Sequence, residues 1–239
     1  MPYIKETCIA GKTIEINKYY SYQVHPIGGR APKEKPETES SKKRNLRNAV
    51  KKLRRILNTN FVDGDYLVRM DFQKVTPKDS EEMQALTAKA IRKIKAAYKR
   101  SGSEFKYVYV KEIGPKGSKH IHMVCNRCDL EFISKNWIYG YIHVDPLSSD
   151  GQYSKIAEYF IKYSSRTEAT EGSLIGKRWN ASLNLKKPKI SKRVIKANRF
   201  KEEPIVQKGY YLDKDSVTYG VSELTGYEYY GYTLIKGGG

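Results

Sequence analysis

Cysteine, acidic residues and long apolar runs are scarce in this 239-residue chain, and each scarcity excludes a class of protein. Three cysteines are too few for the disulfide framework of a small secreted domain. No stretch approaches the ~18 consecutive apolar residues of a membrane-spanning helix, and no lipidation motif is present. Lys5 and Glu6 interrupt any apolar signal region. The sequence therefore predicts a cytoplasmic protein that has no membrane partner.

The shortage of acids leaves the chain strongly positive. Against 26 Asp and Glu stand 45 Lys and Arg, which gives a formal net charge of +19. An excess of this size indicates a polyanionic partner, and without a membrane signal we expect nucleic acid. Phenylalanine is also scarce, at six, whereas there are 20 tyrosines. Their rings either stack on bases or line the edge of the core.

Two of the cysteines, Cys125 and Cys128, form a C-x-x-C pair. A structural zinc site needs two further ligands at matching spacing, and Cys8 is the only other thiol in the sequence. We therefore interpret the pair as ordinary cysteines at the end of a strand rather than as a zinc or redox site.

Hydrophobic periodicity predicts helices and strands in an order that favours an antiparallel sheet. Thr76, followed by Pro77, is the expected N-cap of the second helix. Hairpins dominate and no parallel crossover is required, so the order predicts an α+β fold in which helices cover an antiparallel sheet. The expected helices span residues 41–57, 76–99 and 153–166, and the expected strands span residues 13–24, 65–72, 105–113, 119–125 and 141–144.

Composition divides the chain into three segments. We expect an N-terminal strand and loop extension over residues 1–40, a core over 41–166, and a basic, tyrosine-rich extension over 167–239. The helix at 41–57 carries eight cations and no acid. A solvated helix face normally mixes both signs, so we interpret this helix as facing phosphates. A second stretch without acids lies at residues 186–201.

His120 and His122 are the residues that point to chemistry. Residues two apart on a strand face the same side, so both imidazoles can bind one metal ion. Glu112 lies on the preceding strand of the expected hairpin and can offer an oxygen ligand. Two imidazoles and one carboxylate leave positions open on a divalent ion, as a catalytic site requires. The alternatives are two ordinary polar strand residues and a salt bridge from Glu112 to Lys119.

A candidate nucleophile lies on the helix expected at residues 153–166. Tyr159, Lys162 and Tyr163 share one face of that helix, because three or four residues make one turn. Tyrosine is a poor nucleophile at neutral pH because its pKa is near 10. A metal that polarises a phosphate, together with a nearby cation, removes much of this difficulty. The alternative is that the tyrosines join Phe160 in an apolar stripe and belong to the core.

Taken in order, these motifs resemble those of the HUH rolling-circle replication initiators. The three motifs are the hydrophobic strand at residues 67–72, His120-Ile121-His122, and a helix with the pattern Y-x-x-K from Tyr159. The likeness covers residues 41–166 and is closest to initiators of microviruses, phages and mobile elements of Gram-positive bacteria. It implies an HUH fold of the RRM or ferredoxin-like kind, with about five antiparallel strands and flanking helices, working in a bacterial host cell.

The resemblance also implies a reaction and a set of roles. A tyrosine attacks single-stranded origin DNA, leaving a 5′-phosphotyrosine link and a free 3′-OH that primes synthesis, and the strand is later rejoined. His120 and His122 would hold Mg²⁺ or Mn²⁺ with Glu112 as third ligand, and Lys162 would orient the phosphate or the metal. Tyr159 is the expected nucleophile. Tyr163 is either a second nucleophile or a packing residue.

Three points depart from the family pattern or remain open. Arg69 and Asp71 stand where the family's first motif often contains threonine, so no catalytic role is assigned within that strand. The segment Gly172–Arg178 lacks the spacing of a phosphate-binding loop, so host helicase and polymerase are expected partners. Two other functions fit the sequence: a transposase or relaxase with the same chemistry, and a nucleic-acid-binding protein without activity. The sequence leaves the nicked site and the oligomeric state open.

Overall fold

The computed structural model describes residues 2–20, 39–114, 116–171, 177–197, 199–222 and 226–237, apart from the side chains of Arg166 and residues 169–171. Part of the strand expected at 13–24 and most of the segment Gly172–Arg178 lie outside the described residues.

The chain divides into two compact units. Unit 2 is the continuous stretch Ala49–Lys186, and unit 1 combines Met1–Asn48 with Lys187–Gly239. The boundary falls inside helix α1 (Glu39–Asn60). This division differs from the expected one, because the two terminal segments contribute strands to a single sheet and because the central unit extends to Lys186.

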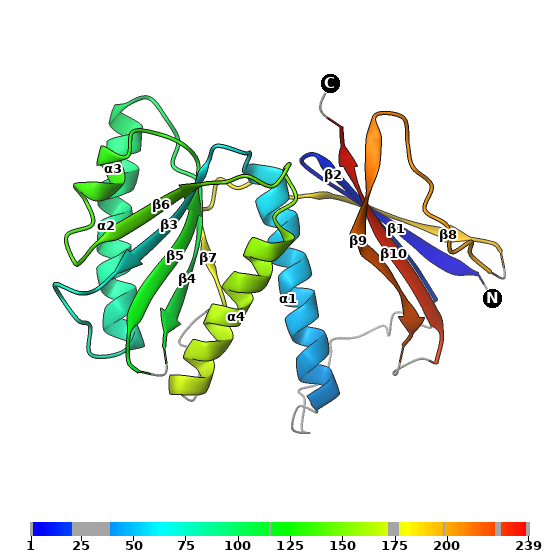
Figure 1. Cartoon of the computed structure of the whole chain (residues 1–239), viewed down its shortest axis with the longest axis horizontal. Helices are drawn as coiled ribbons and strands as arrows, with labels where there is room; N and C mark the ends of the chain where they lie inside the picture. The colour runs from blue at the N-terminus through cyan, green and yellow to red at the C-terminus, as the bar shows by residue number, and fades with distance from the viewer. Residues whose placement is uncertain are drawn as a thin grey trace, which may run out of the picture. The chain divides into compact units, whose positions relative to one another are not determined.

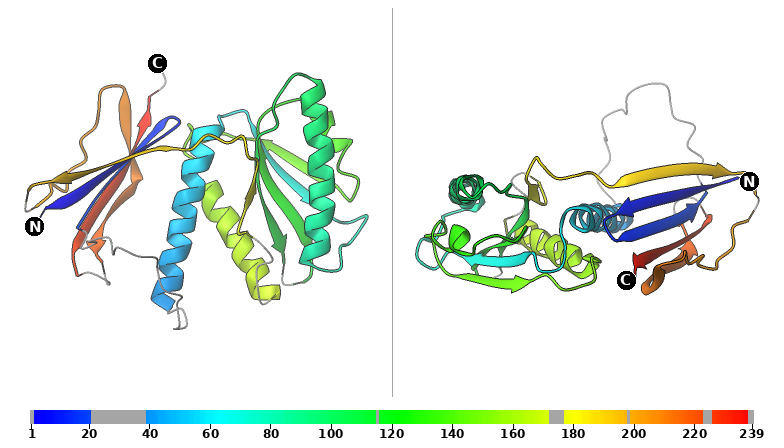
Figure 2. Two further views of the ribbon diagram at one scale, coloured as in Figure 1. Left: turned by 180° about the vertical axis from the view of Figure 1, so that it is seen from behind. Right: turned by 90° about the horizontal axis from the view of Figure 1, so that it is seen from above.

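Unit 2 contains an antiparallel sheet in the strand order β6-β3-β5-β4-β7. Helices α2 and α3 cover one of its faces and α4 covers the other (Figures 1 and 2). The α+β fold with an antiparallel sheet of five strands and flanking helices, expected from the sequence, is confirmed in the described residues. The elements are β3 (Tyr66–Asp71), α2 (Ser80–Arg100), β4 (Tyr107–Ile113), β5 (Lys119–Cys125), α3 (Glu131–Ser134), β6 (Ile142–Pro146), α4 (Ser154–Glu171) and β7 (Asn180–Ala181).

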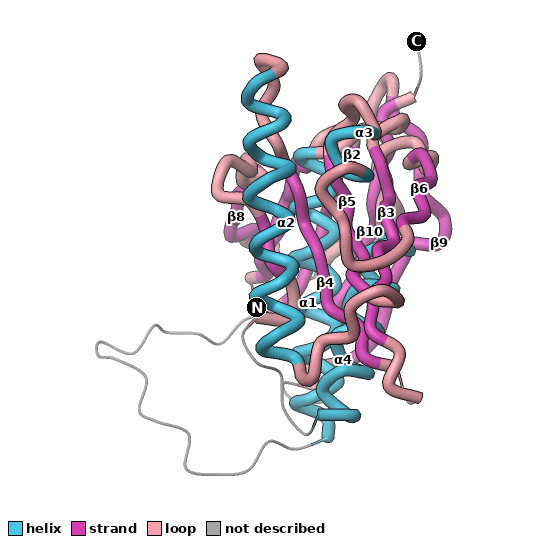
Figure 3. Tube along the Cα trace, turned by 90° about the vertical axis from the view of Figure 1, so that its left-hand side faces the viewer, coloured by secondary structure: helices cyan, strands magenta, loops and turns pink. Residues whose placement is uncertain are grey.

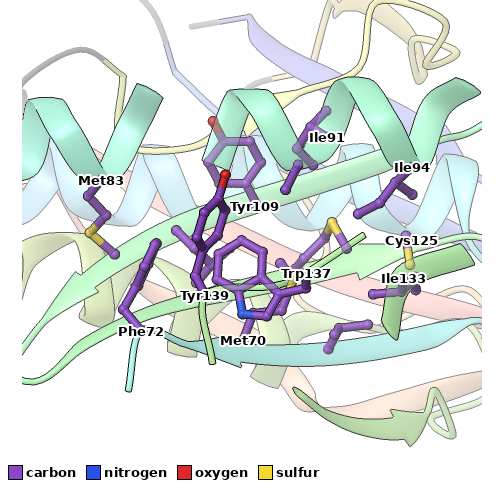
Figure 4. Close-up of a cluster of buried hydrophobic side chains, with 14 of the residues drawn as sticks. Met70, Phe72, Met83, Ile91, Ile94, Tyr109, Cys125, Ile133, Trp137 and Tyr139 are labelled. Carbon is purple, nitrogen blue, oxygen red and sulfur yellow. The ribbon is translucent and has the colours of Figure 1, made fainter. Parts of the chain in front are cut away.

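The main hydrophobic core lies between this sheet and α2, which runs along the strands in Figure 3. Ile121 and Met123 of β5 pack there with Ile91 and Ile94 of α2, and Figure 4 shows part of this cluster. Side chains alternate along a strand, so His120 and His122 project from the opposite face, which α4 covers. The alternation along β5 that buries Ile121 and Met123 in the core therefore also directs His120 and His122 to the α4 side of the sheet.

Helix α2 begins three residues later than expected, and the expected N-cap Thr76 is wrong. The N-cap is Asp79, whose Oδ1 accepts hydrogen bonds from the backbone N–H groups of Glu81 at 2.9 Å and Glu82 at 2.8 Å. Thr76 instead donates its hydroxyl to the carbonyl oxygen of Phe72. A carboxylate caps more strongly than a hydroxyl at this position because its charge also complements the helix dipole.

Two of the three cysteines, Cys125 and Cys128, are part of the packing of unit 2. Cys125 is buried at the end of β5, Cys128 is partly buried, and all three cysteines are free thiols. Burial raises the pKa of the Cys125 thiol. A thiol kept protonated in this way is neither a nucleophile nor a metal ligand.

Unit 1 contains a second antiparallel sheet, in the order β8-β1-β2-β10-β9, which the sequence analysis did not anticipate. Its core holds Ile14, Ile16, Tyr230, Tyr232 and Leu234, so several of the abundant tyrosines pack inside this unit. Much of the basic stretch at 186–201 forms an edge strand of this sheet. The strands are β1 (Tyr3–Ala10), β2 (Thr13–Tyr19), β8 (Lys189–Ile195), β9 (Tyr210–Val221) and β10 (Glu228–Lys236).

None of the helices in the described part of the chain is both long and apolar enough to cross a bilayer.

Candidate active site

The centre of the site is a buried pair of side chains on the hairpin β4–β5. Glu112 lies directly opposite His120 in the register of the two strands. Its carboxylate nevertheless reaches diagonally to His122, and Oε2 lies 2.8 Å from Nε2 of that imidazole. Lys119, the alternative partner considered for Glu112, donates instead to the carbonyl oxygens of Pro77 and Lys78. The hairpin therefore joins a carboxylate and an imidazole beneath α4.

His120 lies beside this pair. Its ring centroid is 6.3 Å from that of His122. Among the described residues, Nδ1 of His120 is buried and has no hydrogen-bond partner. Burial lowers the pKa of His120, and the nearby charge of Arg69 lowers this pKa further. The imidazole is therefore neutral near pH 7, which is the form that can give a lone pair to a cation.

Asp71 borders the histidines and was given no role in the sequence analysis. It lies opposite His120 in the register of β3 and β5 and is buried. Its Oδ1 accepts a hydrogen bond from the backbone N–H of Tyr141 at 2.7 Å. A Cβ atom at Gly140 would lie 2.2 Å from this oxygen, so only glycine lets the chain approach so closely. Residues 140 and 141 are thereby held against Asp71, which β3–β5 pairing places beside His120.

Helix α4 supplies the tyrosines. Phe160 and Ile161 are buried, whereas Tyr159 is 55 % exposed and Tyr163 is partly buried. The Tyr163 ring stacks on His122 with centroids 4.1 Å apart and planes 15° apart. The Tyr159 ring in turn stacks on Tyr163 at 6.1 Å. Tyr159 is therefore not part of the core, and the three rings form a series that leads from the buried pair to solvent.

The start of α4 is fixed by Asn58, near the end of α1. Asn58 Oδ1 accepts the backbone N–H of Tyr153, and its Nδ2 donates to Oε1 of Gln152, both at 2.9 Å. The Tyr153 hydroxyl donates to Oδ1 of Asp63 at 3.1 Å. Asn58 is a positioning residue that sequence reasoning missed. Only a weak indication of this role is present in the sequence, because Asn58 is simply a polar residue that follows the apolar Leu57. Its burial is known only from the structure.

The metal ligands expected from the sequence lie close together but do not surround a common point. Among the described residues, no group of three His, Cys, Asp or Glu side chains is arranged to hold a metal ion. The donor types nevertheless fit a divalent cation. The 2.8 Å between His122 and Glu112 is close to the ~3 Å that separates neighbouring ligands around an octahedral ion. The unpartnered nitrogen of His120 is a further donor. Lys162 is exposed on α4, between the two tyrosines in sequence.

Comparison with known families gives a match that falls on the site. Residues 74–168 match the family described as Replication-associated protein ORF2/G2P. This replication-associated segment covers less than half of the chain and lies within unit 2. It runs from the loop that follows β3 into α4 and contains all six residues proposed for the site. The match supports a replication-initiator family. No curated protein and no solved structure matches the chain.

Proposed function

We propose that this protein initiates replication by nicking and rejoining single-stranded DNA at an origin, with a tyrosine as nucleophile. The observation that carries the proposal is the ring series Tyr159–Tyr163–His122, with His122 bonded to Glu112. It lies inside the replication-associated segment. Tyr163 stacks on the imidazole that bonds to Glu112, and the exposed phenol of Tyr159 stacks on Tyr163. A phenol close to groups that can bind a cation favours nucleophilic attack on a phosphodiester.

In the proposed reaction the Tyr159 oxygen attacks the scissile phosphorus. The bond from phosphorus to the 3′-oxygen breaks, the phenol proton is lost, and the leaving 3′-oxygen takes up a proton. A 5′-phosphotyrosine and a free 3′-OH result. Lys162 would orient the phosphate from the same helix. Tyr163 would be the second nucleophile, since its ring lies between Tyr159 and His122 in the series. It would cut the replicated origin, and the 3′-OH released by this cut would attack the phosphotyrosine at Tyr159, reseal the strand and free the Tyr159 phenol.

His120, His122 and Glu112 would hold Mg²⁺ or Mn²⁺. When bound, the ion would polarise the phosphate and stabilise charge on the leaving oxygen. The hydrogen bond between His122 and Glu112 keeps both donors oriented in the metal-free protein.

The test is formation of a covalent adduct. The protein is incubated with circular single-stranded DNA that carries the region flanking its coding sequence, with Mn²⁺ or with EDTA. We expect a protein–DNA species that survives denaturation with Mn²⁺ and is absent with EDTA. Peptide mass spectrometry should find the nucleotide on the peptide that contains Tyr159. Binding without any adduct at any metal concentration would identify a nucleic-acid-binding protein and refute the proposed chemistry.

The exposed basic part of α1 is expected to contact the DNA backbone. Changing Lys42, Lys43, Arg44 and Arg47 to glutamine should reduce the slope of log Kd against log salt by about 3 for single-stranded DNA, because each contacted phosphate contributes about 0.7. Fluorescence anisotropy at several salt concentrations measures this slope.

Four exposed cations of α2 provide the matched control: Lys89, Arg92, Lys93 and Lys95. Their change to glutamine should reduce the slope less. Equal reductions would show that net charge alone, rather than α1, determines DNA binding.

A further inference from the structure

We infer that Thr167 is a positioning residue that fixes α4, and with it the tyrosines, against the Glu112–His122 pair. The inference rests on the proposed function for its catalytic consequence. The geometric part stands on the hydrogen bonds of one buried hydroxyl, whose residue is 1 % exposed.

The hydroxyl group of Thr167 forms hydrogen bonds with backbone groups of β4 at the edge of the sheet, where a neighbouring strand would otherwise bond to them. In the part of the chain that the structure describes, strand β7 pairs with β4 at Val108 and Tyr109. Further along the same edge, the N–H of Ile113 donates to Thr167 Oγ1 at 3.0 Å. The carbonyl oxygen of Lys111 is also 3.0 Å from this hydroxyl. Buried backbone groups need partners, and here a helix side chain supplies them.

The same hydroxyl connects β4, which carries Glu112, with α4, which carries the tyrosines. Lys111 and Ile113 flank Glu112, so Thr167 holds the strand on both sides of the carboxylate that binds His122. Thr167 Oγ1 also lies 3.2 Å from the carbonyl oxygen of Tyr163, one helical turn earlier. The ring of Tyr163 stacks on His122. The position of the stack therefore depends on where Thr167 meets β4.

A purely structural role is the competing explanation, since a buried threonine in a helix commonly bonds to the carbonyl four residues earlier. Thr87 of α2 is such a residue: it is fully buried, and its hydroxyl donates to the carbonyl oxygen of Met83 at 2.7 Å. Thr87→Val is therefore the matched control for Thr167→Val, because it removes the same hydroxyl from another helix.

The experiment compares Thr167→Val, Thr167→Ser and Thr87→Val in the full chain. The first readout is the NMR chemical shift of the His122 ring protons without metal at fixed pH, because a ring stacked at 4.1 Å shifts them by its ring current. We expect Thr167→Val to lose this shift, and Thr167→Ser and Thr87→Val to keep it. If Thr167→Val does not fold, Thr167→Ala gives the same test.

The second readout is single-turnover DNA cleavage with Mn²⁺. We expect Thr167→Val to lower the cleavage rate about 100-fold, since a 1 Å misplacement of reacting groups costs about that much. The Kd for DNA should not change, and Thr167→Ser should restore the rate. An unchanged His122 shift and an unchanged rate in folded Thr167→Val would overturn the inference. If the wild-type protein does not cleave, the proposed function fails, whereas the NMR comparison still decides whether Thr167 holds the stack.

Discussion

Replacing Tyr159 by phenylalanine is expected to abolish the covalent DNA adduct, with cleavage reduced at least about 10³-fold. The substitution removes only the hydroxyl and retains the ring that stacks on Tyr163. Because Tyr159 is 55 % exposed, the free energy of unfolding should change by less than about 0.5 kcal/mol. A denaturing gel of labelled DNA measures the adduct, and a thermal melt verifies the fold.

Two other tyrosines serve as controls for this prediction. Tyr163→Phe should still form the first adduct but should lose the second cut, and with it the release of a resealed circle. Tyr141→Phe, at an exposed position before β6, should change neither step. If Tyr163→Phe abolishes the adduct while Tyr159→Phe retains it, the two tyrosines have the opposite order of roles.

His122→Ala is expected to reduce metal-dependent cleavage at least about 100-fold. The substitution removes a donor and also the hydrogen-bond partner of Glu112, whose side chain is only 10 % exposed. Loss of a partner for a buried polar group costs about 1–3 kcal/mol, so the melting temperature should fall as well. Mn²⁺ titration followed by electron paramagnetic resonance should show weaker binding than in the wild-type protein.

The matched control is His143→Ala. This histidine lies on β6, its side chain is 68 % exposed, and it pairs with Asp145 at 3.3 Å. Its removal should leave cleavage, Mn²⁺ affinity and melting temperature unchanged. Wild-type Mn²⁺ affinity in His122→Ala would show that the metal is bound elsewhere.

The hairpin that carries the site could be predicted from the sequence, because the pattern that identifies its strands lies within a few neighbouring residues. The expected strand at residues 119–125 coincides with β5, and alternation along it fixes which side His120 faces. The contact of Glu112 was not predictable in the same way. Register places this residue opposite His120, but the side-chain conformation directs its carboxylate to His122 instead.

The face of α4 shows the limit of helical periodicity. The apolar spacing of Tyr159, Phe160 and Tyr163 allowed all three to be core residues. In the structure, smaller residues such as Ala157 and Ser164 share the buried face with Phe160, and the tyrosines lie at its flank. A phenol is amphipathic, so its position at such a boundary depends on the packing around it.

The second sheet escaped prediction because its partners are distant in sequence. Tyr3 of β1 pairs with Ile195 of β8, and Tyr19 of β2 pairs with Tyr229 of β10. Strand β8 is almost entirely exposed and rich in cations, so its composition resembles that of an extended basic segment that contacts phosphates. No local pattern distinguishes an edge strand of this kind from an extended basic segment.

The sheet of unit 1 combines strands from both terminal segments, and this determines the order in which the two units can fold during synthesis. The first hairpin, β1–β2, leaves the ribosome early but must wait for β8 and β10 before both of its edges are paired. A lone hairpin is barely stable in water, and its open edges invite pairing with other chains. The continuous stretch Ala49–Lys186 is complete well before that. A nascent chain therefore carries a complete unit 2 while β1 and β2 still lack their neighbouring strands.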